Sequence, residues 1–153
     1  GFLLNNELTD FNTTPSVKPW TGGAGYNDVQ PNTRPRSSMT PTIILQGDRP
    51  EMIVGGAGGP RIITAALQTI LNVLDFHMPI KEAVEAPRIH HQWIPDELNV
   101  EDKLPPETKR SLERRGHTVR ERTSLGVVQA ILSKGTKTTG AADSRKTERA
   151  RSE

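Results

Sequence analysis

The segment Gly55–Pro60 places four glycines within five residues, immediately before a stretch with helical periodicity. Glycine lets an anionic group approach the bare backbone, and the start of a helix adds a field that favours negative charge. The segment therefore favours a site for a phosphate, a carboxylate or an oxyanion that forms during a reaction, with a tight strand-to-helix turn as the purely structural alternative. Two phosphate-binding motifs fit poorly. A dinucleotide fingerprint needs its third glycine where Arg61 stands, and a P-loop needs Lys-Ser or Lys-Thr where Pro60-Arg61 stand.

Two polar segments carry further groups that can bind a ligand. Glu7 and Asp10 lie three residues apart in NNELTD, and paired carboxylates do acid–base chemistry, bind a metal or hold an ammonium group. Ser37 and Ser38 lie close to two arginines in RPRSSM, and their hydroxyls suit a carboxylate ligand. Ordinary solvated loops are the alternative for both segments. Together with the glycines, the two segments suit a substrate shaped like an α-amino acid with a reactive carbonyl further along.

The elements that must position these groups indicate an α+β fold, in which helices cover a sheet. Strand patterns at 42–46 and 51–55 flank a turn with Gly47-Asp48, which predicts a hairpin. Shorter helices are predicted at 79–87 and 105–116, and further strands at 98–100 and 117–122. The segment 126–143 is predicted to form strands joined by a turn at Lys134-Gly135. The segment from Glu7 to Ser38 is predicted to be a long loop of the kind that carries function.

The helix after the glycines has the strongest pattern in the chain. Pro60 suits its first turn. Apolar residues then follow at spacings of three and four, which predicts one buried face. The residues of this predicted face are Ile63, Leu67, Ile70, Leu71 and Leu74.

The composition narrows the classes of function. The 153 residues suit one domain, but aromatic residues make up only 4%, so we expect either a loop-rich domain or a core completed by another chain. The net charge is only +2 and basic runs are interleaved with acidic residues, which argues against nucleic-acid binding. The absence of cysteine excludes disulfides, thiolate metal sites and a cysteine nucleophile. No apolar run approaches the length of about 20 residues that a membrane span needs.

The adjacent residues His90 and His91 raise the question of a metal site. Neighbouring residues of a strand point to opposite faces, and neither an HExxH motif nor a third ligand accompanies them. We therefore expect the histidines to pack with Trp93, and we assign no metal and no cofactor. For Arg61 and Arg88 the sequence leaves open whether either forms a structural ion pair.

Five segments, taken in chain order, resemble the small subunit of gamma-glutamyltranspeptidase, also called glutathione hydrolase, and most of all the bacterial enzymes. They read GFLLNNELTDF, NTRPRSSMTPTI, GGAGGPRIITAALQTILNVLDF, EAVEAPRIHHQWIPDEL and GAADSRK. The resemblance implies an N-terminal nucleophile (Ntn) hydrolase with a four-layer αββα sandwich, of which this chain forms a part. It implies that residues 1–142 are the C-terminal part of the small subunit. Residues 143–153 are expected to be a disordered charged tail.

The resemblance also implies a reaction. Members of the family are made as a precursor that cuts itself into a large and a small subunit, and a threonine freed at the start of the small subunit attacks the gamma-glutamyl amide of glutathione. Water, an amino acid or a peptide then accepts the glutamyl group. By their matching positions, Glu7 and Asp10 are expected to hold the α-amino group of the substrate, although many bacterial members have Gln where Glu7 stands. The pair Ser37 and Ser38 is expected to bind its α-carboxylate, and the N–H groups of Gly58 and Gly59 to form the oxyanion hole.

The nucleophile has no matching position in this chain. It is expected upstream of Gly1, because the NTT segment at 12–14 is internal and the mechanism needs a free α-amino group on the threonine. The chain alone is therefore expected to be inactive, with the large subunit of the same precursor as its partner and a periplasmic or secreted location. Two alternatives are a related beta-lactam acylase that acts on glutaryl side chains, and a non-catalytic binding or assembly module.

Overall fold

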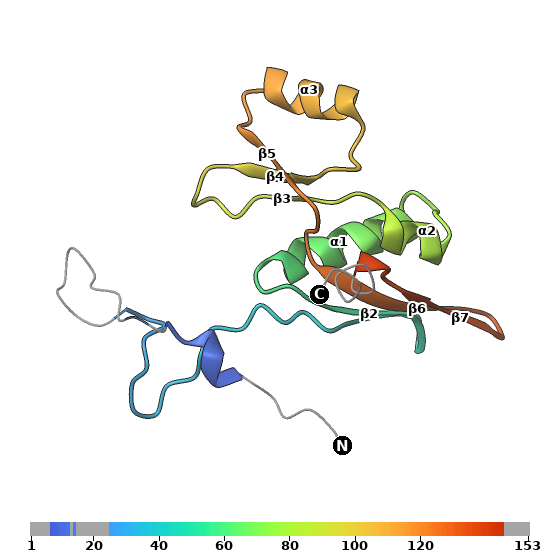
Figure 1. Ribbon diagram of the computed structural model, residues 1–153. Coiled ribbons are helices and arrows are strands. Elements are labelled where there is room, and N and C mark those ends of the chain that lie inside the picture. Colours follow the sequence, from blue (N-terminus) through green and yellow to red (C-terminus); the bar gives the residue numbers. More distant parts are fainter. Residues whose placement is uncertain (1–6, 13, 15–24, 146–153) are drawn as a thin grey trace. The chain divides into compact units, whose positions relative to one another are not determined.

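The computed structural model of the chain describes residues 7–12, 14 and 25–145 (Figure 1). The chain divides into two compact units, residues 1–37 and residues 38–153. Among the described residues, no helix has the length and apolar character that crossing a membrane requires.

The first unit is built around short polar contacts. A 3₁₀ helix spans Glu7–Asp10, and Asn12 forms an isolated parallel bridge with Asp28. The Asp28 side chain is buried and accepts hydrogen bonds from the Gly25 N–H at 2.6 Å and from Asn12 Nδ2 at 2.7 Å. The predicted long loop is thus folded back on itself by hydrogen bonds.

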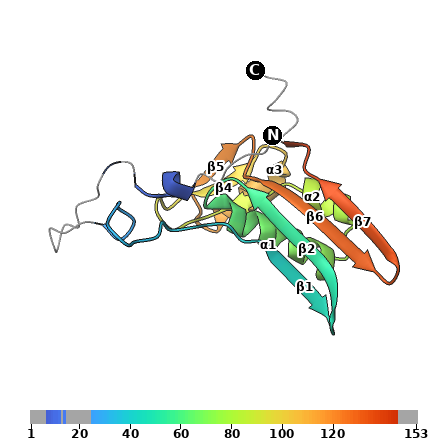
Figure 2. The same ribbon diagram turned by 90° about the horizontal axis from the view of Figure 1, so that it is seen from below.

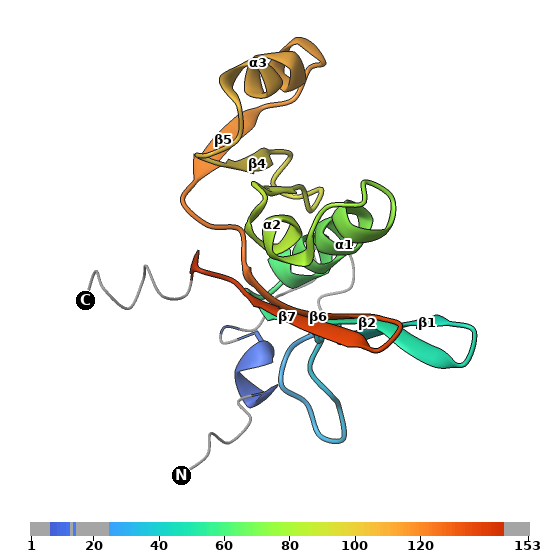
Figure 3. The same cartoon turned by 90° about the vertical axis from the view of Figure 1, so that its right-hand side faces the viewer.

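The second unit contains a four-stranded antiparallel sheet in the order β1-β2-β6-β7 (Figure 2). Its strands are β1 (Thr42–Gln46), β2 (Arg49–Ala57), β6 (Val127–Lys134) and β7 (Lys137–Ala142). The helices α1 (Arg61–Leu74) and α2 (Ile80–Glu85) lie on one face of this sheet (Figure 3). The predicted hairpin and the predicted helix-covered sheet are confirmed.

A second, three-stranded sheet has the order β3-β4-β5. Its strands are β3 (Ile89–His90), β4 (Leu98–Glu101) and β5 (Val119–Arg122). The strands β4 and β5 run parallel, so the chain must cross over between them, and helix α3 (Pro106–Arg114) provides this crossover. No residue of α3 is buried, as expected for a charged surface helix.

The core lies between the four-stranded sheet and the two helices on it. In β2, Met52 and Val54 are buried while Ile53 between them is 41% exposed, because successive side chains of a strand point to opposite faces. From the helices, small residues such as Ala65, Ala66 and Ala83 fill the space against the sheet.

The predicted buried face of α1 is wrong in part. Ile63 and Leu67 are 48% and 51% exposed, and only Ile70 and Leu74 of the predicted set pack at the edge of the core. The buried residues are Ile62, Ala65, Ala66, Thr69 and Val73. The small side chains on this face let the helix approach the sheet closely, whereas the periodicity argument gave weight only to large apolar residues.

Candidate active site

The glycine-rich segment forms the connection between β2 and α1. The strand ends at Ala57 and the helix begins at Arg61, so that Gly58 and Gly59 form the turn itself. Their φ angles are +140° and +61°, conformations that L-residues with a side chain rarely adopt. The glycines are thus required by the backbone path, in agreement with the structural alternative for the segment.

The same turn presents backbone donors at the start of a 14-residue helix. The Ile62 N–H donates to the Gly59 carbonyl at 3.0 Å, which begins the helical pattern. Within the described part of the chain, neither the Gly58 N–H nor the Gly59 N–H donates to a backbone carbonyl or a side chain. A small pocket of about 140 Å³ adjoins the turn. Its lining residues are Ala57, Gly58, Arg61, Ser124, Gly126 and Val127.

The predicted carboxylate pair lies on one short helix of the first unit. Glu7 and Asp10 are three residues apart in a 3₁₀ helix, which has three residues per turn, so their side chains lie on the same side, and both residues are exposed. Two carboxylates on one side of a helix suit a cationic group such as an ammonium.

A residue that sequence reasoning missed connects this helix to the serine segment. Asn27 Nδ2 donates to the Asp10 carbonyl at 2.7 Å, and Asn27 Oδ1 accepts from the Arg36 N–H at 2.7 Å. Arg36 directly precedes Ser37, so one half-buried amide side chain links the backbones of two predicted binding segments within the first unit. A lone Asn in a polar loop gives no sequence signal for such a link.

Of the two predicted serines, Ser37 is exposed and closes the first unit, and Ser38 is half-buried and opens the second. Gly58 and Gly59 belong to the second unit. The structure therefore brings together Glu7 with Asp10, and Gly58 with Gly59. The joint binding of one ligand by all six residues stays a prediction.

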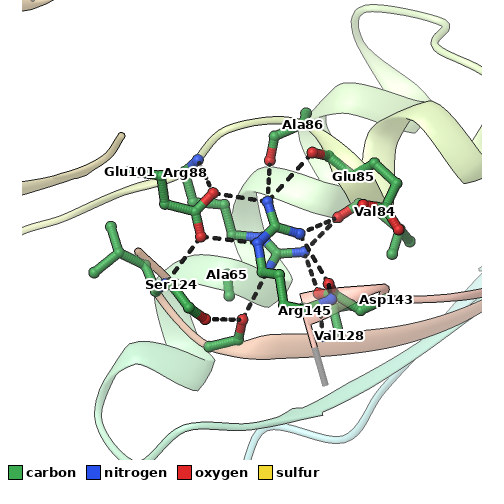
Figure 4. Close-up of polar contacts among 12 residues, drawn as sticks. Ala65, Val84, Glu85, Ala86, Arg88, Glu101, Ser124, Val128, Asp143 and Arg145 are labelled. Carbon is green, nitrogen blue, oxygen red and sulfur yellow. Dashed lines mark hydrogen bonds and ion pairs between the residues drawn. The ribbon is translucent and has the colours of Figure 1, made fainter. Parts of the chain in front are cut away.

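A buried charge network consists of two cations and two anions, Arg88, Glu101, Asp143 and Arg145 (Figure 4). Arg88 Nη2 lies 2.9 Å from Asp143 Oδ2, and Arg145 Nη1 lies 2.9 Å from Asp143 Oδ1. Arg145 Nη2 lies 2.7 Å from Glu101 Oε2. The two charges of each sign balance, which is the condition for keeping ions in a protein interior. The open question about Arg88 is thereby decided in favour of a structural ion pair.

Both arginines also donate to the last carbonyls of α2. The Val84 carbonyl accepts from Arg88 Nη2 at 2.6 Å and from Arg145 Nη1 at 3.0 Å. Cations at a helix C-terminus satisfy carbonyls that have no partner within the helix. The network therefore joins α2 to the chain segments that carry Glu101 and Asp143.

The environment of the network shifts the pKa of three members. Burial lowers the pKa of Arg88, and the nearby positive charge of Arg145 lowers it further. The negative charges of Asp143 and Glu101 raise this pKa in part, but it remains below its ordinary value. Burial alone would raise the pKa of Asp143, but hydrogen bonds from the Val128 N–H and from Arg145 lower it below its ordinary value. Burial alone would lower the pKa of Arg145, but its bonds to Glu101 and Asp143 raise it. The carboxylate of Asp143 is thus stabilised in its charged form.

The segment predicted as a charged tail begins inside this network. Asp143 and Arg145 are 3% and 9% exposed, and Ser144 donates from its N–H to Glu85 Oε1 at 2.9 Å. Residues 146–153 lie outside the described residues, so the prediction for them stays a prediction.

The two adjacent histidines have separate surroundings. His90 is buried, with Nδ1 at 2.8 Å from Thr64 Oγ1 and Nε2 at 3.0 Å from Gln92 Oε1. The ring of His91 contacts Asp96 at 3.0 Å. Trp93 is 77% exposed and so forms no buried packing, but its backbone N–H donates to His91 Nδ1 at 3.1 Å. No group of three metal-ligating side chains occurs among the residues that the structure describes.

The antiparallel sheet with two helices on one face and the small mixed sheet define an α+β fold. Its match to solved structures places this fold in the Ntn hydrolase class. A sequence model of the family described as Gamma-glutamyltranspeptidase matches residues 1–152, and the chain belongs to this family.

Individual relatives agree with this membership. The glutathione hydrolase proenzyme of Escherichia coli K12 is 43% identical over 134 residues, which cover 86% of this chain and 23% of that protein. A mutant gamma-glutamyltranspeptidase of Helicobacter pylori superposes with a TM-score of 0.79 at 43% identity, covering 95% of this chain and 82% of that chain. The enzyme of Pseudomonas nitroreducens complexed with L-DON gives a TM-score of 0.78 at 36% identity, covering 95% and 78%. The chain spans about a quarter of the length of the curated relatives it matches.

Proposed function

We propose that this chain is the C-terminal part of the small subunit of a gamma-glutamyl transferase and glutathione hydrolase. Its role is to form most of the binding pocket for the gamma-glutamyl group. The observation that carries the proposal is the Gly58–Gly59 turn in a chain of this family, with two backbone amides at the start of α1 that have no partner among the described residues.

The proposed site divides the substrate into a charged head and a reacting carbonyl. The carboxylates of Glu7 and Asp10 hold the α-ammonium group, and the hydroxyls of Ser37 and Ser38 donate to the α-carboxylate. The N–H groups of Gly58 and Gly59 donate to the carbonyl oxygen, and these bonds strengthen as negative charge develops on it. A single donor of this kind contributes about 10²- to 10³-fold to kcat.

The bond changes need a nucleophile from a preceding segment. The hydroxyl oxygen of an N-terminal threonine attacks the gamma-carbonyl carbon, while the free α-amino group of that threonine takes the hydroxyl proton. The amine product leaves with a proton as the tetrahedral intermediate collapses to an acyl-enzyme. Water, an amino acid or a peptide then attacks the ester and releases the glutamyl group from the threonine.

The partner of this chain is, in this proposal, the large subunit of the same precursor. The name proenzyme carried by the relatives supports a precursor, and the low aromatic content supports a core completed by another chain. A periplasmic or secreted location is proposed on the resemblance to the bacterial members alone.

The test compares the 153-residue chain with the protein made from the chain together with its preceding coding segment. Both are assayed for release of nitroaniline from gamma-glutamyl-4-nitroanilide. We expect turnover by the longer protein, its loss when the threonine at the new N-terminus is replaced by Ala, and none by the chain alone. Clear turnover by the purified chain alone would refute the assignment of the nucleophile.

A further inference from the structure

The glycine turn touches a second glycine backbone. A Cβ atom on Gly58 would lie 2.8 Å from the Cα of Gly126, a distance that real Cβ contacts essentially never show. The two backbones are therefore in direct van der Waals contact, with no room for a side chain between them. The position of the Gly58 peptide depends on where Gly126 lies.

Gly126 is itself confined on the other sides. Its φ angle is +96°, and a Cβ atom there would lie 3.3 Å from the Ala57 carbonyl oxygen and 3.7 Å from the Ala65 Cβ. Gly126 thus fits between the last residue of β2 and the first turns of α1. The Gly58–Gly59 turn and the helix α1 that follows it both contact Gly126.

The segment that carries Gly126 is held by hydrogen bonds to two residues of the buried charge network. The Leu125 N–H donates to Glu101 Oε1 at 2.9 Å, and the Gly126 carbonyl accepts from Arg88 Nη1 at 3.0 Å. Leu125 is only 1% exposed and both charged partners are 2% exposed. Buried, charge-assisted hydrogen bonds of this kind are short and hold their partners closely.

We propose that Gly126 is a positioning residue for the oxyanion hole, and that the Leu125–Gly126 segment transmits the rigidity of the buried charge network to the Gly58–Gly59 turn. The inference rests on the proposed function, because it assigns the segment a role in the same reaction. Catalytic donors have to be held within about 0.5 Å of their working positions by the structure behind them. The contact of Gly126 with Gly58 holds the backbone N–H donor of Gly58 in this way.

The proposal predicts an effect on kcat rather than on KM. A methyl group at position 126 displaces the Ala57 carbonyl, and with it the Gly58 peptide, by a few tenths of an ångström, which weakens the oxyanion bonds. The proposed function assigns the charged head of the substrate to other residues, namely Glu7, Asp10, Ser37 and Ser38. Ground-state binding is therefore expected to change little.

The test uses Gly126→Ala and a matched control, Gly116→Ala, in the mature protein made with its preceding segment. Gly116 has almost the same φ angle, +94°, but a Cβ there meets nothing within 4 Å, so the control carries the same backbone strain without the contact. We expect Gly126→Ala to lower kcat by about 10-fold or more, with KM changed by less than about 2-fold. The control is expected to keep the kcat of the unchanged protein. Equal kcat values for the two variants would overturn the proposal.

A second variant decides the matter if Gly126→Ala does not yield mature protein. Glu101→Gln keeps the size of the side chain but replaces one carboxylate oxygen by an NH₂ group, so it cannot accept all the bonds from Leu125, Arg88 and Arg145. A fall in kcat at unchanged KM supports the positioning role, and an unchanged kcat overturns it. If the unchanged mature protein has no activity, the proposed function fails, which is a different result from equal activity of the variant and the control.

Discussion

The two parts of the candidate site are held in place by different interactions. The segment of Asp10 is tied to that of Ser37 by a half-buried neutral side chain, Asn27, through hydrogen bonds of 2.7 Å. The Gly58–Gly59 turn instead rests on Gly126, which is held by the buried charge network. One part depends on local contacts in a polar loop, and the other on contacts that cross the core.

The difference matches the two tasks proposed for these parts. Each interaction with an exposed ion is weak, so small changes in the positions of the polar groups that bind it have little effect. An oxyanion hole needs donors whose positions are fixed before the reaction begins. In the proposed function, the buried network therefore supports the part of the site that faces the reacting carbonyl, although none of its four residues is proposed to touch the substrate.

The largest expected effect comes from breaking the network. Asp143→Ala leaves two buried arginines with one carboxylate, and removal of one partner of a buried pair destabilises a protein by about 3–5 kcal/mol. Glu121→Ala, which removes the exposed partner of Lys109, is the matched control and should change the free energy of unfolding by about 1 kcal/mol or less. Urea unfolding of the mature variants measures both changes. Equal destabilisation by the two variants would contradict the special role of the network.

The acid sensitivity of the protein follows from the same carboxylate. The pKa of Asp143 is lower in the folded protein than in the unfolded chain, so the folded state binds fewer protons at this group. The stabilisation is complete above the unfolded value of about 4 and is lost as the pH falls through the folded value. In the same urea series, Asp143→Asn should remove this part of the pH dependence below about pH 4. An unchanged slope would contradict the lowered pKa.

A smaller effect is expected at Asn27. Asn27→Ala removes the link between the Asp10 carbonyl and the Arg36 N–H, which should raise KM for a gamma-glutamyl donor by about 3- to 10-fold and change kcat less. Thr33→Ala, which removes a different loop hydrogen bond at 2.8 Å, is the control and should leave KM unchanged. Steady-state kinetics with the anilide measure both. A KM that stays constant in Asn27→Ala, or rises equally in the control, would contradict the role of Asn27 in positioning the binding segments.

Local sequence signals predicted the elements well. The turn with Gly47-Asp48, the helix after Pro60 and the turn at Gly135 were each marked by residues whose own conformational preferences decide the structure. The glycine turn belongs to this group, since its φ angles require glycine whatever its function.

Features that depend on distant partners could not be predicted in this way. The buried face of α1 contains Ala65 and Ala66. These small side chains allow another backbone to approach the helix closely, an effect that their own hydrophobicity does not indicate. Arg88 and Asp143 are 55 positions apart in the sequence (143 − 88), so their pairing leaves no local pattern. Asn27 and Gly126 act through contacts with backbone atoms, which no side-chain motif records.

The central claim is that the site recognises a gamma-glutamyl group by its charged head while two amides receive its carbonyl. The most direct measurement compares kcat/KM of the mature protein for gamma-glutamyl-4-nitroanilide and for glutaryl-4-nitroanilide, which lacks only the α-amino group. The account predicts that the glutaryl substrate is used at least about 10³-fold less well, because Glu7 and Asp10 lose their partner, and that Asp10→Ala removes most of this preference. Comparable kcat/KM values for the two substrates would contradict the account and favour a glutaryl acylase.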